Sequence, residues 1–246
     1  MSLLSAHGAM LPLGGSGGYA AAVLADAPWG YWKLNESPAE GVAAADASGN
    51  GRNGTYRGVA VTAYAAASGL FAGSSAAIQF KNAGYIACPT LTLASAQKFT
   101  LECMVKASSI VTNENMIGGD DAGSNRRWQF RITSAGKLEF LTITPSTVSV
   151  VGAATITDGN AHLVHAVFDP SLSAASGICK IYVDGALDTS STSSNSITAG
   201  TAFPIVGART GAGSNPFTGI LDEVAIYTTA LSAAQIAAHW AARNAS

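Results

Sequence analysis

The sequence alternates apolar and polar residues in many short segments that are separated by glycine, asparagine and aspartate. A period of two is typical of β-strands. Asp184-Gly185 and Ser134-Ala135-Gly136 have the composition of hairpin turns. The predicted strands span residues 31–34, 76–86 (a strand pair), 99–107, 127–133, 137–144, 148–155, 162–169, 179–184, 203–208 and 220–227, with residues 39–56 and 113–125 as loops. Many short strands without a long helix predict an all-β protein of two packed sheets.

The last strand leads into a short helix. Residues 220–227 alternate, so Asp222 is expected on the same face as Val224 and Ile226, where an unpaired carboxylate is costly. Ser232 and Gln235 have the spacing of a capping box, which predicts the start of a C-terminal helix.

The apolar positions of these strands predict the core. Free cysteine is among the most buried residue types, so Cys103 and the other two cysteines are interpreted as core residues rather than metal ligands. Trp128 alternates with Phe130 and is expected in the core as well. The remaining predicted core residues are Leu101, Val105, Ile132, Val164, Phe168, Val224, Ile226 and Trp240.

Composition narrows the possible partners. Charged residues are 11% of the chain and the formal net charge is −2, which gives no basic surface for nucleic acid. No apolar run approaches the roughly 20 residues that span a bilayer. No lysine or arginine precedes Lys33, so no secretory signal is expected. Residues 1–18 are apolar, glycine-rich and without formal charge, and we expect a flexible arm that packs on a neighbouring subunit, followed by one domain over residues 19–246. The alternative is that the arm packs back on its own domain or forms only a crystal contact.

Six segments, taken in order, resemble laminin-G-like domains of the concanavalin A-like lectin and glucanase type. They are YAAAVLADAPWGYWKLNE (19–36), DASGNGRNGTY (46–56), FTLECMVKA (99–107), DGNAHLVHAVFD (158–169), KIYVDGAL (180–187) and LDEVAIYTTALSAAQIAAHW (221–240). The resemblance implies a two-sheet antiparallel jelly-roll sandwich with a short C-terminal helix and, here, an extended N-terminal arm. Fold alone does not fix the activity.

The resemblance also implies a structural calcium ion that ties the first strand to the last. The matching positions are Glu36, Asp46, Asn53 and Asp222. Carboxylate and carbonyl oxygens suit calcium. The alternative is that Asp222 accepts hydrogen bonds from backbone amides of the glycine-rich loop, with no ion. No other cofactor is expected.

Glycanases of this fold carry a Glu-x-Asp-x-(x)-Glu strand, which this sequence lacks. Glu102 and Glu139 come from different strands and form a carboxylate pair only if one outward sheet face carries both. A solvated or partner-covered face is the favoured interpretation. We therefore expect a protein that is not an enzyme.

Lectins of this fold bind sugars with loops at the sandwich edge, and loops on rigid sheets often carry function. Met104 and Ala161 stand where the family commonly has tryptophan, which weakens an inherited sugar platform. The candidate glycan-binding residues are Asp120, Asp121, Asn125 and Arg126 on one loop and Arg209 and Asn215 on another.

The segment from Tyr19 to Trp32 is similar to laminin-G-like proteins of phage particles and bacterial surfaces. This similarity predicts a virion structural protein, either capsid decoration or tail, that contacts other virion proteins. The arm predicts a symmetric homo-oligomer such as a trimer, because ordering so many glycines requires a sizeable partner surface. The alternative is a carbohydrate-binding lectin module for adhesion to surface glycans, located outside the cell or on a bacterial surface.

Overall fold

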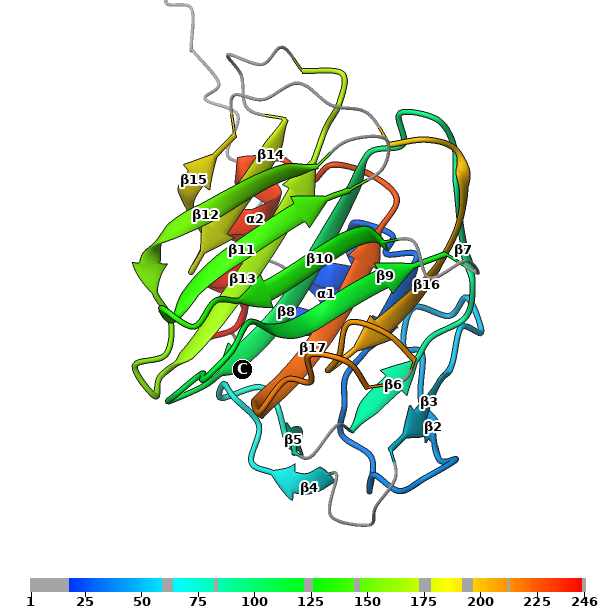
Figure 1. Cartoon of the computed structure of the whole chain (residues 1–246). Helices are drawn as coiled ribbons and strands as arrows, with labels where there is room; N and C mark the ends of the chain where they lie inside the picture. The colour runs from blue at the N-terminus through cyan, green and yellow to red at the C-terminus, as the bar shows by residue number, and fades with distance from the viewer. Residues whose placement is uncertain are drawn as a thin grey trace, which may run out of the picture.

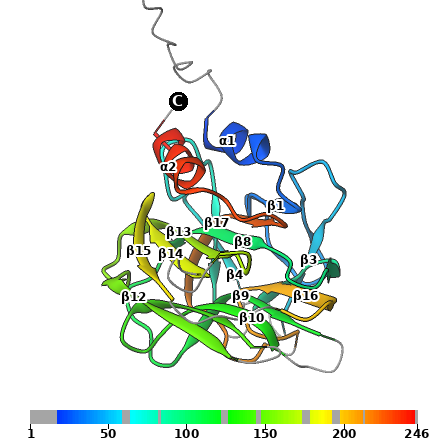
Figure 2. The same ribbon diagram turned by 90° about the horizontal axis from the view of Figure 1, so that it is seen from above.

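The computed structural model describes residues 18–58, 64–81, 84–121, 126–143, 147–172, 178–191, 197–211 and 213–244. Within these residues two antiparallel sheets pack face to face, and two short helices lie together on the outer side of one sheet (Figures 1 and 2). The all-β sandwich predicted from the alternation is therefore confirmed. The predicted arm, apart from Gly18, lies outside the described residues. None of the helices in the described part of the chain is long and apolar enough to cross a membrane.

Sheet 1 carries the helices. Its strand order is β15-β14-β13-β8-β17-β5-β4, and β1 also pairs with β17. The strands are β1 (Gly30–Trp32), β4 (Tyr64–Ala67), β5 (Ala77–Phe80), β8 (Phe99–Lys106), β13 (Ala161–Phe168), β14 (Cys179–Val183), β15 (Ala186–Ser190) and β17 (Gly219–Tyr227). Trp32 pairs with Val224, so the first strand lies directly beside the last strand.

Sheet 2 has the order β12-β11-β10-β9-β16-β6-β3-β2, with β7 on the side of β16. The strands are β2 (Ala43–Ala44), β3 (Gly54–Arg57), β6 (Tyr85–Ala87), β7 (Leu91–Leu93), β9 (Glu114–Asp120), β10 (Arg126–Ile132), β11 (Lys137–Thr142), β12 (Val148–Thr155) and β16 (Gly200–Val206). Three predictions fail here. The loop predicted over 113–125 contains β9, and the loop predicted over 39–56 contains β2 and most of β3. The pair predicted over 76–86 is split, because β5 joins sheet 1 and β6 joins sheet 2.

The core fills the space between the sheets. Trp128, Cys103 and the other predicted core residues of the strands belong to one buried cluster. The three cysteines are all buried and free. Trp240 differs from the prediction, because it is only partly buried on the outer side of sheet 1, with the Arg243 guanidinium 3.3 Å from its ring centroid.

The outer face of sheet 1 packs against α1 (Tyr19–Ala25) and α2 (Ala233–Ala242). The predicted capping box is confirmed: the Ser232 hydroxyl accepts from the Gln235 amide, and the Gln235 side chain accepts from the Ser232 amide. Leu231, just before the cap, and Ile236 are both buried in this second cluster. The cap thus begins the helix where its apolar face reaches the sheet.

A β-bulge in β17 corrects the predicted position of Asp222. Asp222 pairs with Met104 and Ala225 pairs with Glu102, so one extra residue is inserted between these two positions. Glu223 takes up the insertion with a φ of 52°. Asp222 therefore does not share a face with Val224, whose side chain lies in the core. The inserted residue reverses the faces predicted for the residues before Glu223, whereas Val224 and Ile226 keep the predicted core face.

Candidate functional site

A pocket of about 420 Å³ opens on the face of sheet 2 that points away from the core. It lies where β9 ends, next to β16, β6 and β3. The residues that line it are Arg57, Tyr85, Ala87, Cys88, Asp120, Asp121, Phe203, Ile205, Thr210 and Gly211. Its volume is within the range of small-ligand sites, which combine apolar walls with a few polar groups.

Asp120 is the central polar residue of this pocket. It ends β9, its Cα partners are Phe203 in β16 and Arg126 in β10, and only 7% of its surface is exposed. Its Oδ1 atom is buried and has no hydrogen-bond partner among the described residues. Burial raises the pKa of Asp120, and the charges of Arg209 and Arg126 oppose that rise. Asp120 thus lines the pocket with one carboxylate oxygen that has no donor among the described residues.

Two aromatic residues provide apolar walls. Phe203 is 38% exposed although it is large and apolar, and Tyr85 is half-buried on β6. Arg57, the Cα partner of Tyr85, adds a cationic group at the pocket edge. Sequence reasoning did not select these three residues. The outward positions of Phe203 and Tyr85 in their strands were a usable signal, but which strands are neighbours was not visible.

The six predicted glycan-binding residues are only partly brought together. Asp120 and Asp121 line the pocket, and Asp121 lies 3.6 Å from the Arg127 guanidinium. Arg126 and Arg209 are near enough for their charges to act on Asp120, but neither lines the pocket. Asn215 accepts a 3.0 Å hydrogen bond from Arg209 Nη1, so it positions that arginine. Asn125 lies outside the described residues.

Two glycines of β9 explain why a strand forms in a segment with a loop-like composition. A Cβ on Gly119 would lie 2.3 Å from the Trp128 ring, and a Cβ on Gly118 would lie 2.5 Å from the Arg209 carbonyl oxygen. Only glycine allows this close approach. The glycines therefore place Asp120 and Arg209 side by side.

Glu102 and Glu139 do not form the carboxylate pair that the sequence had left as the less favoured possibility. Glu102 lies in β8 of sheet 1, whereas Glu139 lies in β11 of sheet 2. Glu139 accepts hydrogen bonds from Arg131 and Ser149, and these side chains form a polar network on the outer face of sheet 2. Glu102 and Glu139 thus lie on different sheets, and each has its own hydrogen-bond partners.

The predicted calcium ligands form a hydrogen-bonded loop instead. Asp46 accepts from the amides of Tyr31, Ser48 and Arg52, and these hydrogen bonds lower its pKa against the effect of burial. Glu36 Oε1 accepts from the Ala45 amide and its Oε2 accepts from the Tyr56 hydroxyl.

The Asn53 side-chain oxygen accepts from the Asp46 amide, whereas Asp222 accepts from the Leu70 amide in a different loop. The oxygens of Glu36, Asp46 and Asn53 named here already have donors, and among the described residues Glu36, Asp46 and Asp222 do not come together as a metal-binding group. The donor set therefore does not fit a calcium ion here.

The sequence matches a laminin G-like family model, described as the concanavalin A-like lectin/glucanases superfamily, over residues 80–237. This match covers more than half of the chain, and the protein belongs to that superfamily. A comparison with curated proteins gave no match.

Solved structures share the fold at low sequence identity. Domain 4 of AbnA, an extracellular arabinanase from Geobacillus stearothermophilus solved with arabinotriose, aligns with a TM-score of 0.60 and 21% identity, covering 85% of this chain and 96% of that one. The binding domain of Paraclostridial Mosquitocidal Protein 1 aligns with a TM-score of 0.62 and 14% identity over 88% of this chain. The ligand-binding domain of botulinum neurotoxin serotype D, solved with N-acetylneuraminic acid, aligns with a TM-score of 0.60 and 14% identity over 91%. The chain spans about half, 52%, of each toxin structure.

Proposed function

We propose that the protein is a non-catalytic carbohydrate-binding module, and that the pocket at the end of β9 is its sugar site. The observation that carries the proposal is Asp120, which lines a pocket walled by aromatic residues and whose buried Oδ1 atom lacks a hydrogen-bond partner among the described residues. An unsatisfied buried acceptor is costly, and a ligand that donates to it recovers that cost.

A sugar ring offers the two surfaces that this pocket accommodates. Its hydroxyl groups can donate to Asp120, and its C–H face can pack on the partly exposed ring of Phe203. Arg57 on the opposite side adds a donor for a ring oxygen or an acidic substituent. The pocket is open at the surface of a rigid sheet, which suits a ligand that is part of a longer chain.

The solved neighbours support this proposal over the virion structural role. An arabinanase domain in complex with arabinotriose and a toxin domain in complex with N-acetylneuraminic acid have this fold. The assignment to a virion, and self-association through residues 1–18, remain sequence-based predictions.

The absence of catalysis is part of the proposal. Glycoside hydrolysis uses two carboxyl groups on either side of the scissile bond, about 5–9 Å apart. Asp121, the other acid that lines the pocket, is paired with Arg127. We therefore assign Asp121 a positioning role rather than a chemical one.

A glycan array of the full chain, followed by calorimetry on the glycans that bind, tests the proposal. Asp120→Asn keeps the side-chain shape but removes the charge, and we expect it to weaken binding by about tenfold to a hundredfold. Phe203→Ala removes the exposed ring and is expected to weaken binding as well. Asp158→Asn, at an exposed turn away from the pocket, serves as the matched control and is expected to bind as wild type.

Two results would contradict the proposal. Sugar binding that is unchanged in Asp120→Asn and Phe203→Ala would place the site elsewhere. Hydrolysis of a bound glycan that disappears in Asp121→Asn would make the module an enzyme.

A further inference from the structure

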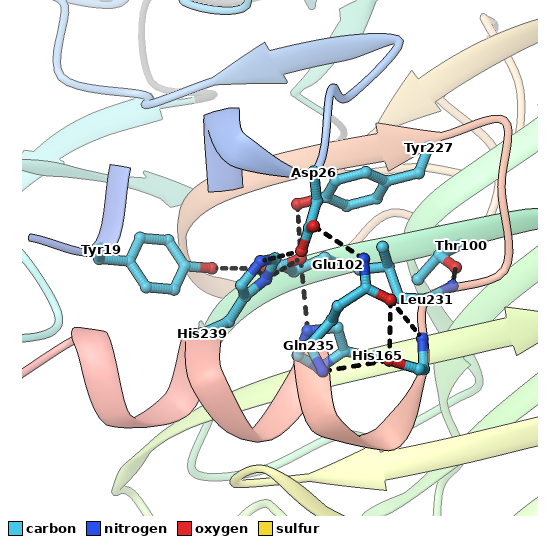
Figure 3. A network of polar contacts seen from close by, with 10 residues as sticks. Tyr19, Asp26, Thr100, Glu102, His165, Tyr227, Leu231, Gln235 and His239 are labelled. Atoms are coloured by element: carbon cyan, nitrogen blue, oxygen red, sulfur yellow. Dashed lines mark hydrogen bonds and ion pairs between the residues drawn. The ribbon is translucent and has the colours of Figure 1, made fainter. Parts of the chain in front are cut away.

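A second cluster of polar groups lies far from the pocket, beneath the two helices on the outer face of sheet 1. Glu102 projects from β8, His165 from the neighbouring strand β13, and His239 from α2 (Figure 3). Glu102 and His165 are fully buried and His239 is 1% exposed. Ionisable groups are almost never buried so completely without a specific partner.

The three side chains converge on one point. His239 Nδ1 lies 3.0 Å from Glu102 Oε2, and His165 Nε2 lies 3.3 Å from the same oxygen. One ligand atom of each residue lies within 4.8 Å of the others. In a tetrahedral zinc site with bonds near 2 Å the donor atoms are about 3.3 Å apart. The observed separations therefore match those of metal ligands.

His165 provides an independent observation. Neither of its ring nitrogens has a hydrogen-bond partner among the described residues, although both are buried and Nε2 faces the Glu102 carboxylate. A neutral imidazole with Nε2 only in a 3.3 Å contact with Glu102 Oε2, and with Nδ1 lacking a partner among the described residues, is poorly satisfied, which is costly. A metal ion bound to Nε2 satisfies the acceptor directly.

The surroundings of His239 also resemble those of a metal ligand. Its second nitrogen, Nε2, lies 3.0 Å from Asp26 Oδ2 at the end of α1. Metal-binding histidines commonly donate their other N–H to a carboxylate, which fixes the tautomer and orients the ring. Figure 3 shows Asp26 close to both His239 and Gln235.

We propose that Glu102, His165 and His239 bind a divalent transition-metal ion, with zinc the best match, as a structural site. Two imidazoles and one carboxylate are typical zinc ligands, and Asp26 supports His239 from behind. The phenol oxygens of Tyr19 and Tyr227, which both donate to Glu102, are the donors available for a fourth position. The site is closed to solvent, as structural zinc sites are.

Such an ion would join parts of the chain that are distant in sequence. It would connect β8 and β13 to α2, and through Asp26 to α1. Metal binding at a site that exists only in the folded chain adds directly to stability. The ion would therefore hold the C-terminal helix on the sheet.

Metal analysis of tag-free full-length protein, purified without chelator, tests the inference. We expect about one zinc per chain, and we expect the chelator-treated protein to regain a higher melting temperature when Zn²⁺ is added. Co²⁺ added to the stripped protein is expected to give the visible absorption of a tetrahedral site. These measurements on wild type need no variant to fold.

His165→Gln removes one ligand and leaves the contacts of Glu102 with His239 and both tyrosines. This variant is expected to lose the zinc and the Co²⁺ spectrum. His162→Gln is the matched control, because His162 lies in the same strand but pairs with Asp158 and Asp184. We expect it to keep the metal. Stripped wild type that shows neither a cobalt spectrum nor a zinc-dependent melting shift would overturn the inference, and so would full metal binding by His165→Gln.

Discussion

Asp222 and Glu223 show how the environment of single residues sets their chemistry. Burial raises the pKa of Asp222 to about 6 and that of Glu223 to about 7. Asp222 accepts a 3.0 Å hydrogen bond from the Leu70 amide, but its Oδ1 atom has no partner in the described part of the chain. Tyr31 donates to Glu223, which lowers the pKa of that carboxyl and only partly offsets the burial. The folded protein therefore favours the protonated form of both side chains more strongly than the unfolded chain does.

These raised pKa values predict that stability falls as pH rises. The unfolded pKa of aspartate is about 3.9, so the contribution of Asp222 is complete below about pH 4 and is lost as pH increases through about 6. Two pKa units correspond to a loss of about 2–3 kcal/mol. Urea unfolding of Asp222→Asn, which cannot ionise, should show a smaller decline between pH 4 and 8 than wild type. Equal declines in the two proteins would refute the assignment.

At the scale of elements, the start of α2 is defined by side chains that also join the two helices. Gln235 closes the capping box with Ser232, and its Nε2 donates a 2.7 Å hydrogen bond to Asp26 at the end of α1. The cap satisfies amides that would otherwise lack partners at the helix end. The contact with Asp26 places α1 beside it.

Ser232→Ala should destabilise the protein by about 1 kcal/mol, because an N-cap hydroxyl is lost while the helix keeps its apolar contacts. The free energy of unfolding in urea measures this change. Ser134→Ala, in the exposed turn between β10 and β11, provides the comparison and should stay within about 0.5 kcal/mol of wild type. A loss as large in Ser134→Ala as in Ser232→Ala would mean that the cap is not the cause.

Elements with strong alternation were predictable from sequence, and those shaped by close packing were not. Residues 148–155 match β12 at both ends, and the Asp184-Gly185 turn joins β14 to β15. β9 was missed because Gly118 and Gly119 look like loop residues, although they are required by the approach of Trp128 and Arg209. The bulge at Glu223 was also invisible, since its cause lies in the pairing with β8.

The candidate site residues divide in the same way into those that the sequence indicated and those that only the packing of distant segments reveals. Asp120 and Asp121 were selected because lectins of this fold bind sugars with loops at the sandwich edge, and both residues line the pocket. Glu102 was expected on an outward sheet face, but α1 and α2 cover it, and His165 beside it is buried as well. Their convergence with His239 depends on contacts between positions more than 60 residues apart, which alternation along one strand does not encode.

At the scale of the whole molecule, one core holds the two sheets together, and Phe168 lies near its centre. Phe168 is fully buried in β13, pairs with Phe99 in β8, and its ring centroid is 5.3 Å from that of Phe99. The Phe99 ring in turn lies 5.2 Å from Trp128 of the opposite sheet. These packed rings cross the sandwich, so removing the Phe168 ring weakens the packing of both sheets.

Phe168→Ala should lower the free energy of unfolding by about 3–5 kcal/mol, because the cavity left behind cannot close between two rigid sheets. Both sheets share this core, so we expect one unfolding transition that shifts to lower denaturant, seen equally by tryptophan fluorescence and far-ultraviolet circular dichroism. Leu187→Ala, on the edge strand β15 with 54% of its surface exposed, is the matched control and should change little. A cost below about 1 kcal/mol for Phe168→Ala, or two separate transitions, would show that the sheets do not share one core.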